Sequence, residues 1–441
     1  MDRSCESYRI AERRRAEVFG LQVSRRGLLA SLGMGAVGWM GIRSALSQAV
    51  VSHEAREHRG DILVSVFLRG GMDGLSAVVP YAEDAYHRGR PNLRLRSPKD
   101  ASADAAYQVF DLDGFFGLNP AMKALLPFYR EGSMAIVHAV GSGDQTRSHF
   151  EAMNAMERGM YRVGGGLQTG WVARHLSSSP RRNPTPLRAV ALSSLTPDSL
   201  RGASHATTLA SLSDYRLADP EMLDMLKGLY GSGKDAMAQA GRDTLDVLEK
   251  LRGVKVEDQP KGYPQTDLGR GLRQVATLIR SNVGLEVACL EMGGWDTHVA
   301  QGAITGWLPS YLKELADSLA AFVLDVGPEM KRVTMVVQTE FGRRVEENTG
   351  LGTDHGRASC MFLFGGAVAG GKVYTNWPGM ETAQLDDVGD LRVTTDYRDV
   401  WGDALTARVA DSKPAEVFPG WKPRGAGYFK PISIYLGDPI A

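Results

Sequence analysis

The feature that most constrains the fold is a short apolar run followed at once by a glycine turn and a charged pair. Residues 284–290 are mostly apolar, which predicts a buried strand, and Gly293-Gly294-Trp295-Asp296-Thr297-His298 comes next. Residues 305–325 then carry apolar side chains at helical spacing. A strand, a tight turn and a helix in this order favour an open α/β sheet, which binds ligands at the carboxyl ends of its strands.

Asp296 and His298 are the first candidate ligands at that edge. An extended i, i+2 pair points to the same side, so both side chains can reach one cation. The alternative is a strand-end turn with a capping aspartate and a histidine satisfied by its neighbours. The motif alone leaves both readings open.

The same arrangement recurs along the chain. We expect a mainly parallel sheet with helices on both faces and strands near residues 62–68, 134–140, 188–192, 285–291 and 333–338. Polar groups follow four of these strands: Asp73, Ser148, Asp296 with His298, and Glu340. Asp354 and His355 add a fifth group in a glycine-flanked loop before the apolar run 360–364.

Carboxylates mixed with imidazoles suit a divalent cation, namely Zn, Mn, Mg or Ca, and no thiolate is present to select a softer metal. Such a cation can ionise a serine hydroxyl or a water molecule and can bind an oxygen of a transferring phosphoryl or sulfuryl group. An anionic ester is therefore the expected substrate.

Ser148 is expected at or near a helix N-terminus, where backbone N–H groups and the helix dipole favour an anion. Its alternative role is a plain N-cap. Arg147 either holds an oxyanion or is solvated. His149 is a metal ligand or, as we favour here, a helix-start histidine packed against a neighbour.

The N-terminus resembles a twin-arginine export signal, with Arg25 and Arg26 in Ser24-Arg25-Arg26-Gly27-Leu28-Leu29. The apolar run 28–42 is short and rich in glycine, and 45–49 offers small residues for cleavage. We predict a signal peptide over 1–49, the twin-arginine translocase as a partner, a periplasmic or otherwise exported location, and no membrane span in the mature protein. A short amphipathic helix is the alternative.

The remaining chain, 50–441, is expected to be one α/β domain with a helical insertion at about 207–282 that forms a wall or lid over the strand ends. The formal net charge of the 441 residues is zero, so nothing global suggests nucleic acid. The three cysteines have no metal-binding spacing and do not indicate a disulfide framework.

Five motifs together resemble the domain-of-unknown-function 1501 proteins: Leu68 to Gly74, Arg147 to Phe150, Gly293 to His298, Thr339 to Arg343 and Thr353 to Gly356. That family is similar in turn to the alkaline phosphatase and sulfatase superfamily. The likeness implies a doubly wound α/β sheet and a metal-dependent ester hydrolase, with Ser148 as the nucleophile. It also implies a ligand set, which is Asp73, Asp296, His298, Glu340 and His355, with Asp354 beside them.

The chain departs from the superfamily at Glu340-Phe341, where an adjacent Asp and His are common, so one imidazole is missing. Either Asp354-His355 compensates for it, or the site holds one metal in place of two, or it holds none. The leading prediction is an exported metal-dependent hydrolase of phosphate or sulfate esters. The alternative is a non-catalytic exported binding or assembly protein that retains the fold.

Overall fold

The computed structural model describes residues 61–422, apart from 163, 165, 182–183, 215–219, 234, 253–261, 366 and 410. The predicted signal peptide, with Arg25 and Arg26, lies outside the described residues. Within the described part of the chain, no helix combines the length and apolar character needed to cross a membrane.

A nine-stranded sheet forms the centre of the molecule, in the order β11-β5-β10-β9-β1-β8-β6-β7, with β12 also paired to β5. Every pairing is parallel except those of β10 with β5 and β9. The strands are β1 (Ile62–Leu68), β5 (Met134–Gly141), β6 (Ala189–Leu192), β7 (Ala206–Leu209), β8 (Val287–Met292), β9 (Val333–Thr339), β10 (Ser359–Gly365), β11 (Val373–Tyr374) and β12 (Thr395–Asp396). The expected mainly parallel α/β sheet is therefore confirmed.

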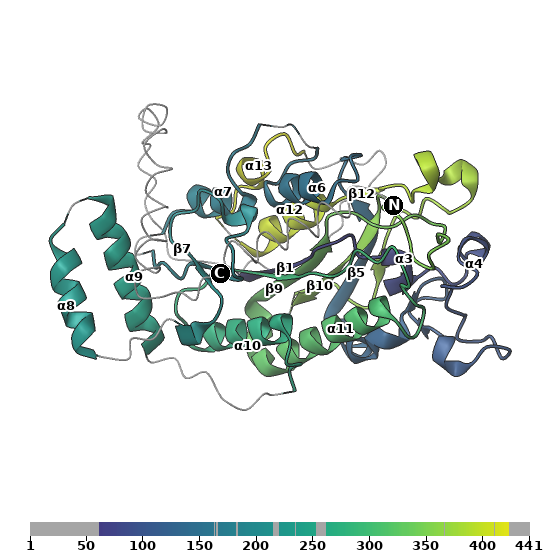
Figure 1. Cartoon of the computed structure of the whole chain (residues 1–441), viewed down its shortest axis with the longest axis horizontal. Helices are drawn as coiled ribbons and strands as arrows, with labels where there is room; N and C mark the ends of the chain where they lie inside the picture. The colour runs from purple at the N-terminus through teal and green to yellow at the C-terminus, as the bar shows by residue number, and fades with distance from the viewer. Residues whose placement is uncertain are drawn as a thin grey trace.

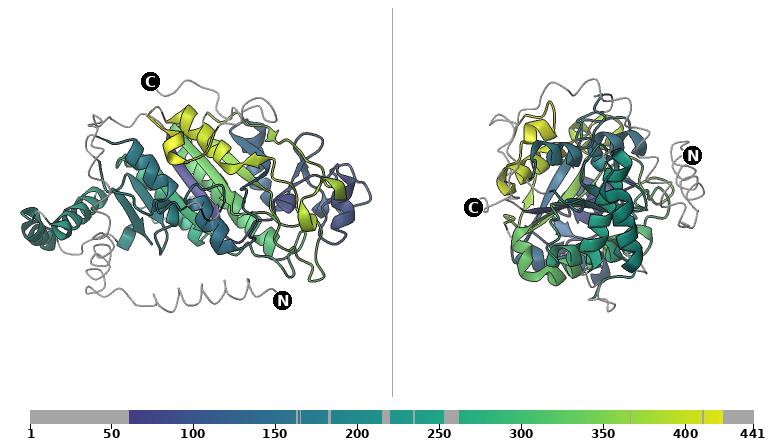
Figure 2. Two further views of the ribbon diagram at one scale, coloured as in Figure 1. Left: turned by 90° about the horizontal axis from the view of Figure 1, so that it is seen from above. Right: turned by 90° about the vertical axis from the view of Figure 1, so that its left-hand side faces the viewer.

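Alternating side chains of the central strands build a core on each face of the sheet. Ile62, Val64 and Val66 of β1 belong to the core formed with α10 (Asp267–Arg280) and α11 (Trp307–Val326). Leu63 and Phe67 belong to the core formed with α7 (Trp171–Ser178), α12 (Tyr397–Arg408) and α13 (Pro414–Val417). Figure 1 shows these helices on opposite sides of the sheet, and the end-on view in Figure 2 shows the sheet between them.

The single antiparallel strand determines which loops can meet. β1, β5, β8 and β9 end at one edge of the sheet, whereas β10 begins there because it runs the other way. The loop that precedes β10 and carries Asp354 and His355 therefore reaches the same edge as the loops that follow the parallel strands.

The predicted helical insertion is only partly separate from the sheet. α8 (Pro220–Gly231) and α9 (Ala236–Arg252) pack against each other at one end of the molecule (Figure 1). α10 instead packs on the sheet and on α11, because one side of it is apolar, so it is part of a covering layer and not a lid. The range also contains β7, which the sequence reading missed.

The other elements are short. They are α3 (Gly74–Ala77), α4 (Asp84–Gly89), α5 (Leu126–Arg130), α6 (His149–Glu157), a small sheet of β2 (Val78–Val79), β3 (Phe110–Asp111) and β4 (Gly117–Leu118), and 3-10 turns η1 (Ala105–Tyr107), η2 (Pro120–Leu125), η3 (Asp198–Leu200), η4 (Leu212–Asp214), η5 (Gly327–Arg332), η6 (Thr382–Gln384) and η7 (Asp387–Gly389).

Candidate metal centre

Three imidazoles and one carboxylate converge at the edge where the central strands end. Nε2 of His355 lies 2.9 Å from Nε2 of His149 and 2.8 Å from Nε2 of His298. Oδ1 of Asp296 lies 3.3, 3.0 and 3.1 Å from Nε2 of His149, His298 and His355. His149 and His355 are nearly fully buried, whereas Asp296 and His298 are partly exposed.

The other nitrogen of each ring is held by an acceptor. The Nδ1 contacts are His149 to Glu340 Oε1 at 2.7 Å, His298 to Asp354 Oδ1 at 3.2 Å, and His355 to the carbonyl oxygen of Arg147 at 2.9 Å. These oxygens can only accept from the rings, so the partners assign the proton to Nδ1 in all three. A second bond of this kind is typical of histidines that bind metals.

Counting lone pairs shows why protons alone do not satisfy the cluster. An imidazole protonated at Nδ1 offers a single lone pair at Nε2. Nε2 of His355 faces Nε2 of both His149 and His298, and with all three rings protonated at Nδ1 none of these nitrogens has a proton to donate to another. A cation would accept such lone pairs, and ligand atoms of His149, Asp296 and His355 all lie within 4.8 Å of one another, so the residues present fit a metal ion.

The electrostatics also favour a positive charge here. Burial alone would raise the pKa of Asp296, but its contacts with the three imidazoles and the nearby Arg343 guanidinium hold it well below its usual range. Burial would lower the pKa of His149, yet Asp296 and Glu340 raise it to about 9. Burial dominates at His355 and lowers its pKa.

Two of the predicted ligands, Glu340 and Asp354, lie behind the imidazoles. Glu340 is buried, and its Oε1 accepts from the Gly70 backbone N–H at 2.8 Å as well as from His149. Asp354 is partly exposed and accepts from Asn348 at 2.9 Å besides contacting His298. In the structure these carboxylates orient histidines.

Asp73, also predicted as a ligand, is paired with Arg90. Both side chains are fully buried, and the Arg90 guanidinium donates to the two carboxylate oxygens at 2.6 and 3.1 Å. Ser76 and Gln301 donate to Oδ2 as well, at 2.7 and 2.8 Å. Gln301 in turn accepts from the hydroxyls of Thr297 and Thr353, so Asp73 supports the loops that carry the cluster.

Ser148 and Arg147 lie where α6 begins. Ser148 is the N-cap residue, but its side chain makes no capping hydrogen bond. Arg147 has a left-handed φ of 51°, and its guanidinium binds Asp390 at 2.6 Å. The Arg147 side chain is thus occupied by an ion pair, while its carbonyl oxygen holds His355.

Sequence reasoning missed two roles, those of Arg343 and Phe341. Arg343 is buried and donates to the carbonyl oxygens of Gly70, Gly71, Thr353 and Trp295 and to Oδ1 of Asp296. Phe341 packs on the rings of His149 and His355, with centroids 4.8 and 5.0 Å apart. His149 itself belongs to the cluster. Its position after a predicted strand end is the sequence feature that could have indicated this.

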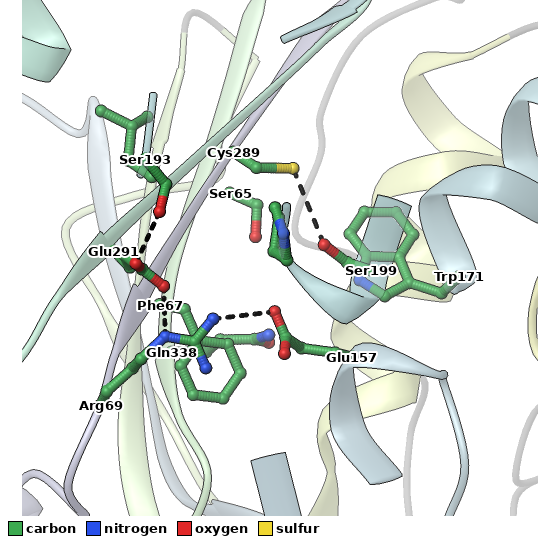
Figure 3. Close-up of a pocket in the computed structure, with 12 residues that line it drawn as sticks. Ser65, Phe67, Arg69, Glu157, Trp171, Ser193, Ser199, Cys289, Glu291 and Gln338 are labelled. Carbon is green, nitrogen blue, oxygen red and sulfur yellow. Dashed lines mark hydrogen bonds and ion pairs between the residues drawn. The ribbon is translucent and has the colours of Figure 1, made fainter. Parts of the chain in front are cut away.

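A neighbouring pocket has different chemistry. It is lined by residues that include Arg69, Glu157, Glu291, Ser199 and Cys289. Figure 3 shows the Arg69 guanidinium between the two glutamates, and the Ser199 hydroxyl facing the Cys289 thiol. Its charged groups are paired with one another, and burial raises the pKa of Cys289 to about 12, so this thiol is not a ready nucleophile.

A mostly parallel α/β sheet with a histidine and aspartate cluster at its carboxyl edge defines the class of protein, a candidate metalloprotein of mixed α/β fold. Residues 61–398 match the family described as "Protein of unknown function (DUF1501)", so the chain belongs to that family. No curated protein matches the chain.

Three solved structures are similar to the chain, with low sequence identity and low TM-scores. A mutant of TAB5 alkaline phosphatase with Mg bound has 11% sequence identity and a TM-score of 0.30, covering 73% of this chain and 96% of that one. The alkaline phosphatase from the Antarctic bacterium TAB5 has 10% identity and a TM-score of 0.29, over 73% and 96% of the chains. The PH0037 protein from Pyrococcus horikoshii has 10% identity and a TM-score of 0.27, over 70% and 86%. Similarity at this level carries no argument about function.

Proposed function

We propose that this protein is an exported, metal-dependent hydrolase of phosphate or sulfate esters, built on a doubly wound sheet like that of alkaline phosphatase. One observation supports the proposal most: the Nε2 atoms of His149, His298 and His355 converge with Oδ1 of Asp296, and each ring is held at Nδ1 by an acceptor. This donor set suits a divalent metal bound before export.

Each residue of the site has a distinct part in the proposed reaction. When bound, the metal ion supplies Lewis-acid activation of a hydroxyl or an ester oxygen. Ser148 is adjacent in sequence to the ligand His149 and stands at the start of α6, so its hydroxyl is the proposed nucleophile. The α6 N-terminus favours the anionic group of the ester. Arg147 acts through its carbonyl oxygen, which positions His355.

The test is metal analysis of the purified protein beside a panel of p-nitrophenyl phosphate and sulfate esters. We expect bound metal and turnover of at least one ester, with turnover lost after chelation and restored by the metal. Stoichiometric metal without turnover on any ester would favour the second candidate, a non-catalytic exported binding protein. The observation that favours this candidate is Phe341, whose ring packs on His149 where the superfamily commonly has another imidazole.

Ser148→Ala should abolish ester turnover and leave metal content and the melting temperature nearly unchanged. The serine makes no capping hydrogen bond, so its removal costs the helix no cap. The matched control is Thr266→Ala, because Thr266 caps α10 by accepting from the Gly269 N–H at 3.3 Å. That control should lose about 1 kcal/mol of stability and keep full turnover. Turnover retained in Ser148→Ala would exclude it as the nucleophile.

Export should depend on the twin arginines. Replacing Arg25 and Arg26 together with lysine should leave the protein in the cytoplasm, because this pair is the proposed address read by the translocase. Cell fractionation of the full chain measures the location, and N-terminal sequencing of the exported form should begin near residue 48 or 50. A double variant that is exported normally would contradict the proposed route.

A further inference from the structure

We infer that the site holds one metal ion of the zinc type, bound by His149, His298, His355 and Asp296, and that no second ion binds beside it. This rests on the proposed metal site but not on turnover. Of the six ligands predicted from the sequence, only Asp296, His298 and His355 are retained, and His149 is the fourth ligand.

Five of the six pairs of ligand atoms already lie close together. The five separations given above run from 2.8 to 3.3 Å. Ligand atoms about 2.0–2.1 Å from a tetrahedral ion lie roughly 3.3 Å apart, so these five contacts need only a slight expansion. The Nε2 atoms of His149 and His298 lie on opposite sides of the Asp296–His355 pair and must move closer together to share one ion. Three imidazoles with one carboxylate favour zinc, and other imidazole-binding transition metals, over Mg and Ca, which prefer all-oxygen sites.

The carboxylates that a second ion would need are already bound. Two-metal sites place their ions about 3.5–4 Å apart, and carboxylates usually hold both. Asp73 accepts hydrogen bonds from Arg90, Ser76 and Gln301 on its two oxygens. Glu340 accepts from Gly70 and His149 on Oε1 and from the Thr339 hydroxyl on Oε2 at 3.0 Å.

Arg343 places a permanent positive charge beside the first site. Its Nη2 lies 2.7 Å from Oδ1 of Asp296, and the side chain is fully buried. Nε donates to Gly71 at 2.7 Å and Nη1 donates to Thr353 at 2.9 Å, so the guanidinium is fixed where it stands. A second divalent ion next to Asp296 would be repelled by this charge and would find Asp73 and Glu340 already hydrogen-bonded.

The experiment measures metal binding without any substrate. The mature chain is depleted with a chelator and titrated with Co²⁺, followed by its visible spectrum, and with Zn²⁺, followed by elemental analysis after gel filtration. We expect one ion per chain for either metal and the strong visible absorption of four-coordinate Co²⁺.

Three variants separate ligands from supporting residues. His149→Ala should lose the stoichiometric ion, whereas Asp73→Asn should keep one ion with affinity within about threefold of wild type. Glu340→Gln should keep one ion but bind it about 10–100-fold more weakly, the usual cost of changing a residue that orients a ligand. Circular dichroism of each depleted variant checks folding; if His149→Ala does not fold, His149→Gln replaces it in the same assay.

Several outcomes would overturn the inference: two ions per chain, a six-coordinate Co²⁺ spectrum, an ion retained by the His149 variant, or an ion lost from Asp73→Asn. One ion per chain without ester turnover would contradict the hydrolase proposal alone, because the titration includes no substrate. The two failures are therefore distinguishable.

Discussion

Replacing Asp296 with alanine should remove both the bound metal and the ester turnover. Its Oδ1 contacts all three imidazole Nε2 atoms and the Arg343 guanidinium. Without the carboxylate, the buried charge of Arg343 faces the metal position with no anion between them. Changing a residue that only orients a ligand costs about 10–100-fold in affinity, so losing the ligand itself should cost more than about 100-fold. Elemental analysis and the ester panel measure the two losses.

Asp354→Asn is the matched control for this variant. Asp354 contacts His298 at Nδ1 and is partly exposed, so its replacement should weaken metal binding without abolishing it. Equal losses in the two variants would contradict the assignment of Asp296 as a ligand and Asp354 as a supporting residue. Normal metal content in Asp296→Ala would contradict the site as a whole.

Replacing Asp73 with asparagine should destabilise the fold more than it disturbs metal binding. The variant leaves Arg90 charged and fully buried without its carboxylate, and breaking a buried pair costs about 3–5 kcal/mol. Chemical denaturation of the metal-depleted protein measures this loss. Asp317→Asn is the control, because the Lys313–Asp317 pair lies on the surface of α11 and should contribute only about 0.3–0.5 kcal/mol. A loss below about 1 kcal/mol in Asp73→Asn would show that the Arg90 pair is not a main support of the fold.

The pH dependence of this loss follows from the pKa of Asp73. Burial alone would raise that pKa, but the Arg90 charge and the hydrogen bonds from Arg90, Ser76 and Gln301 leave it below 3.8. A group with a lowered folded pKa stabilises the protein above its unfolded pKa and loses this contribution as pH falls through the folded value. The stability difference between wild type and Asp73→Asn should therefore be constant from about pH 5 to 8 and shrink below pH 3.8.

The edge of the sheet was predictable because strand length, apolar content and glycine turns are local properties. Asp296 and His298 follow one strand at i, i+2 spacing, and both contribute an atom to the cluster. Which carboxylates are ligands was harder to predict than the position of the site, because it depends on the hydrogen-bond partner of each carboxylate in the folded protein. Asp73 is bound by Arg90, and that pairing spans 17 residues of the chain.

His149 and Glu340 illustrate a second limit. Both follow strand ends, and nothing local distinguishes a ligand from the residue that orients it. The contact between them joins positions 191 residues apart, and only the sheet order brings them together. The antiparallel direction of β10 is also non-local, yet it brings His355 to the site.

The left-handed backbone at Arg147 determines how substitutions at this position affect the site. His355 is oriented by a main-chain oxygen, which every amino acid supplies. Side-chain truncation at 147 removes the ion pair with Asp390 but leaves that oxygen in place. What the position demands is a φ near 51°, which glycine and asparagine adopt readily and β-branched residues do not. An alanine substitution at residue 147 would therefore measure only the loss of the ion pair. It would not detect the role of the carbonyl oxygen that holds His355.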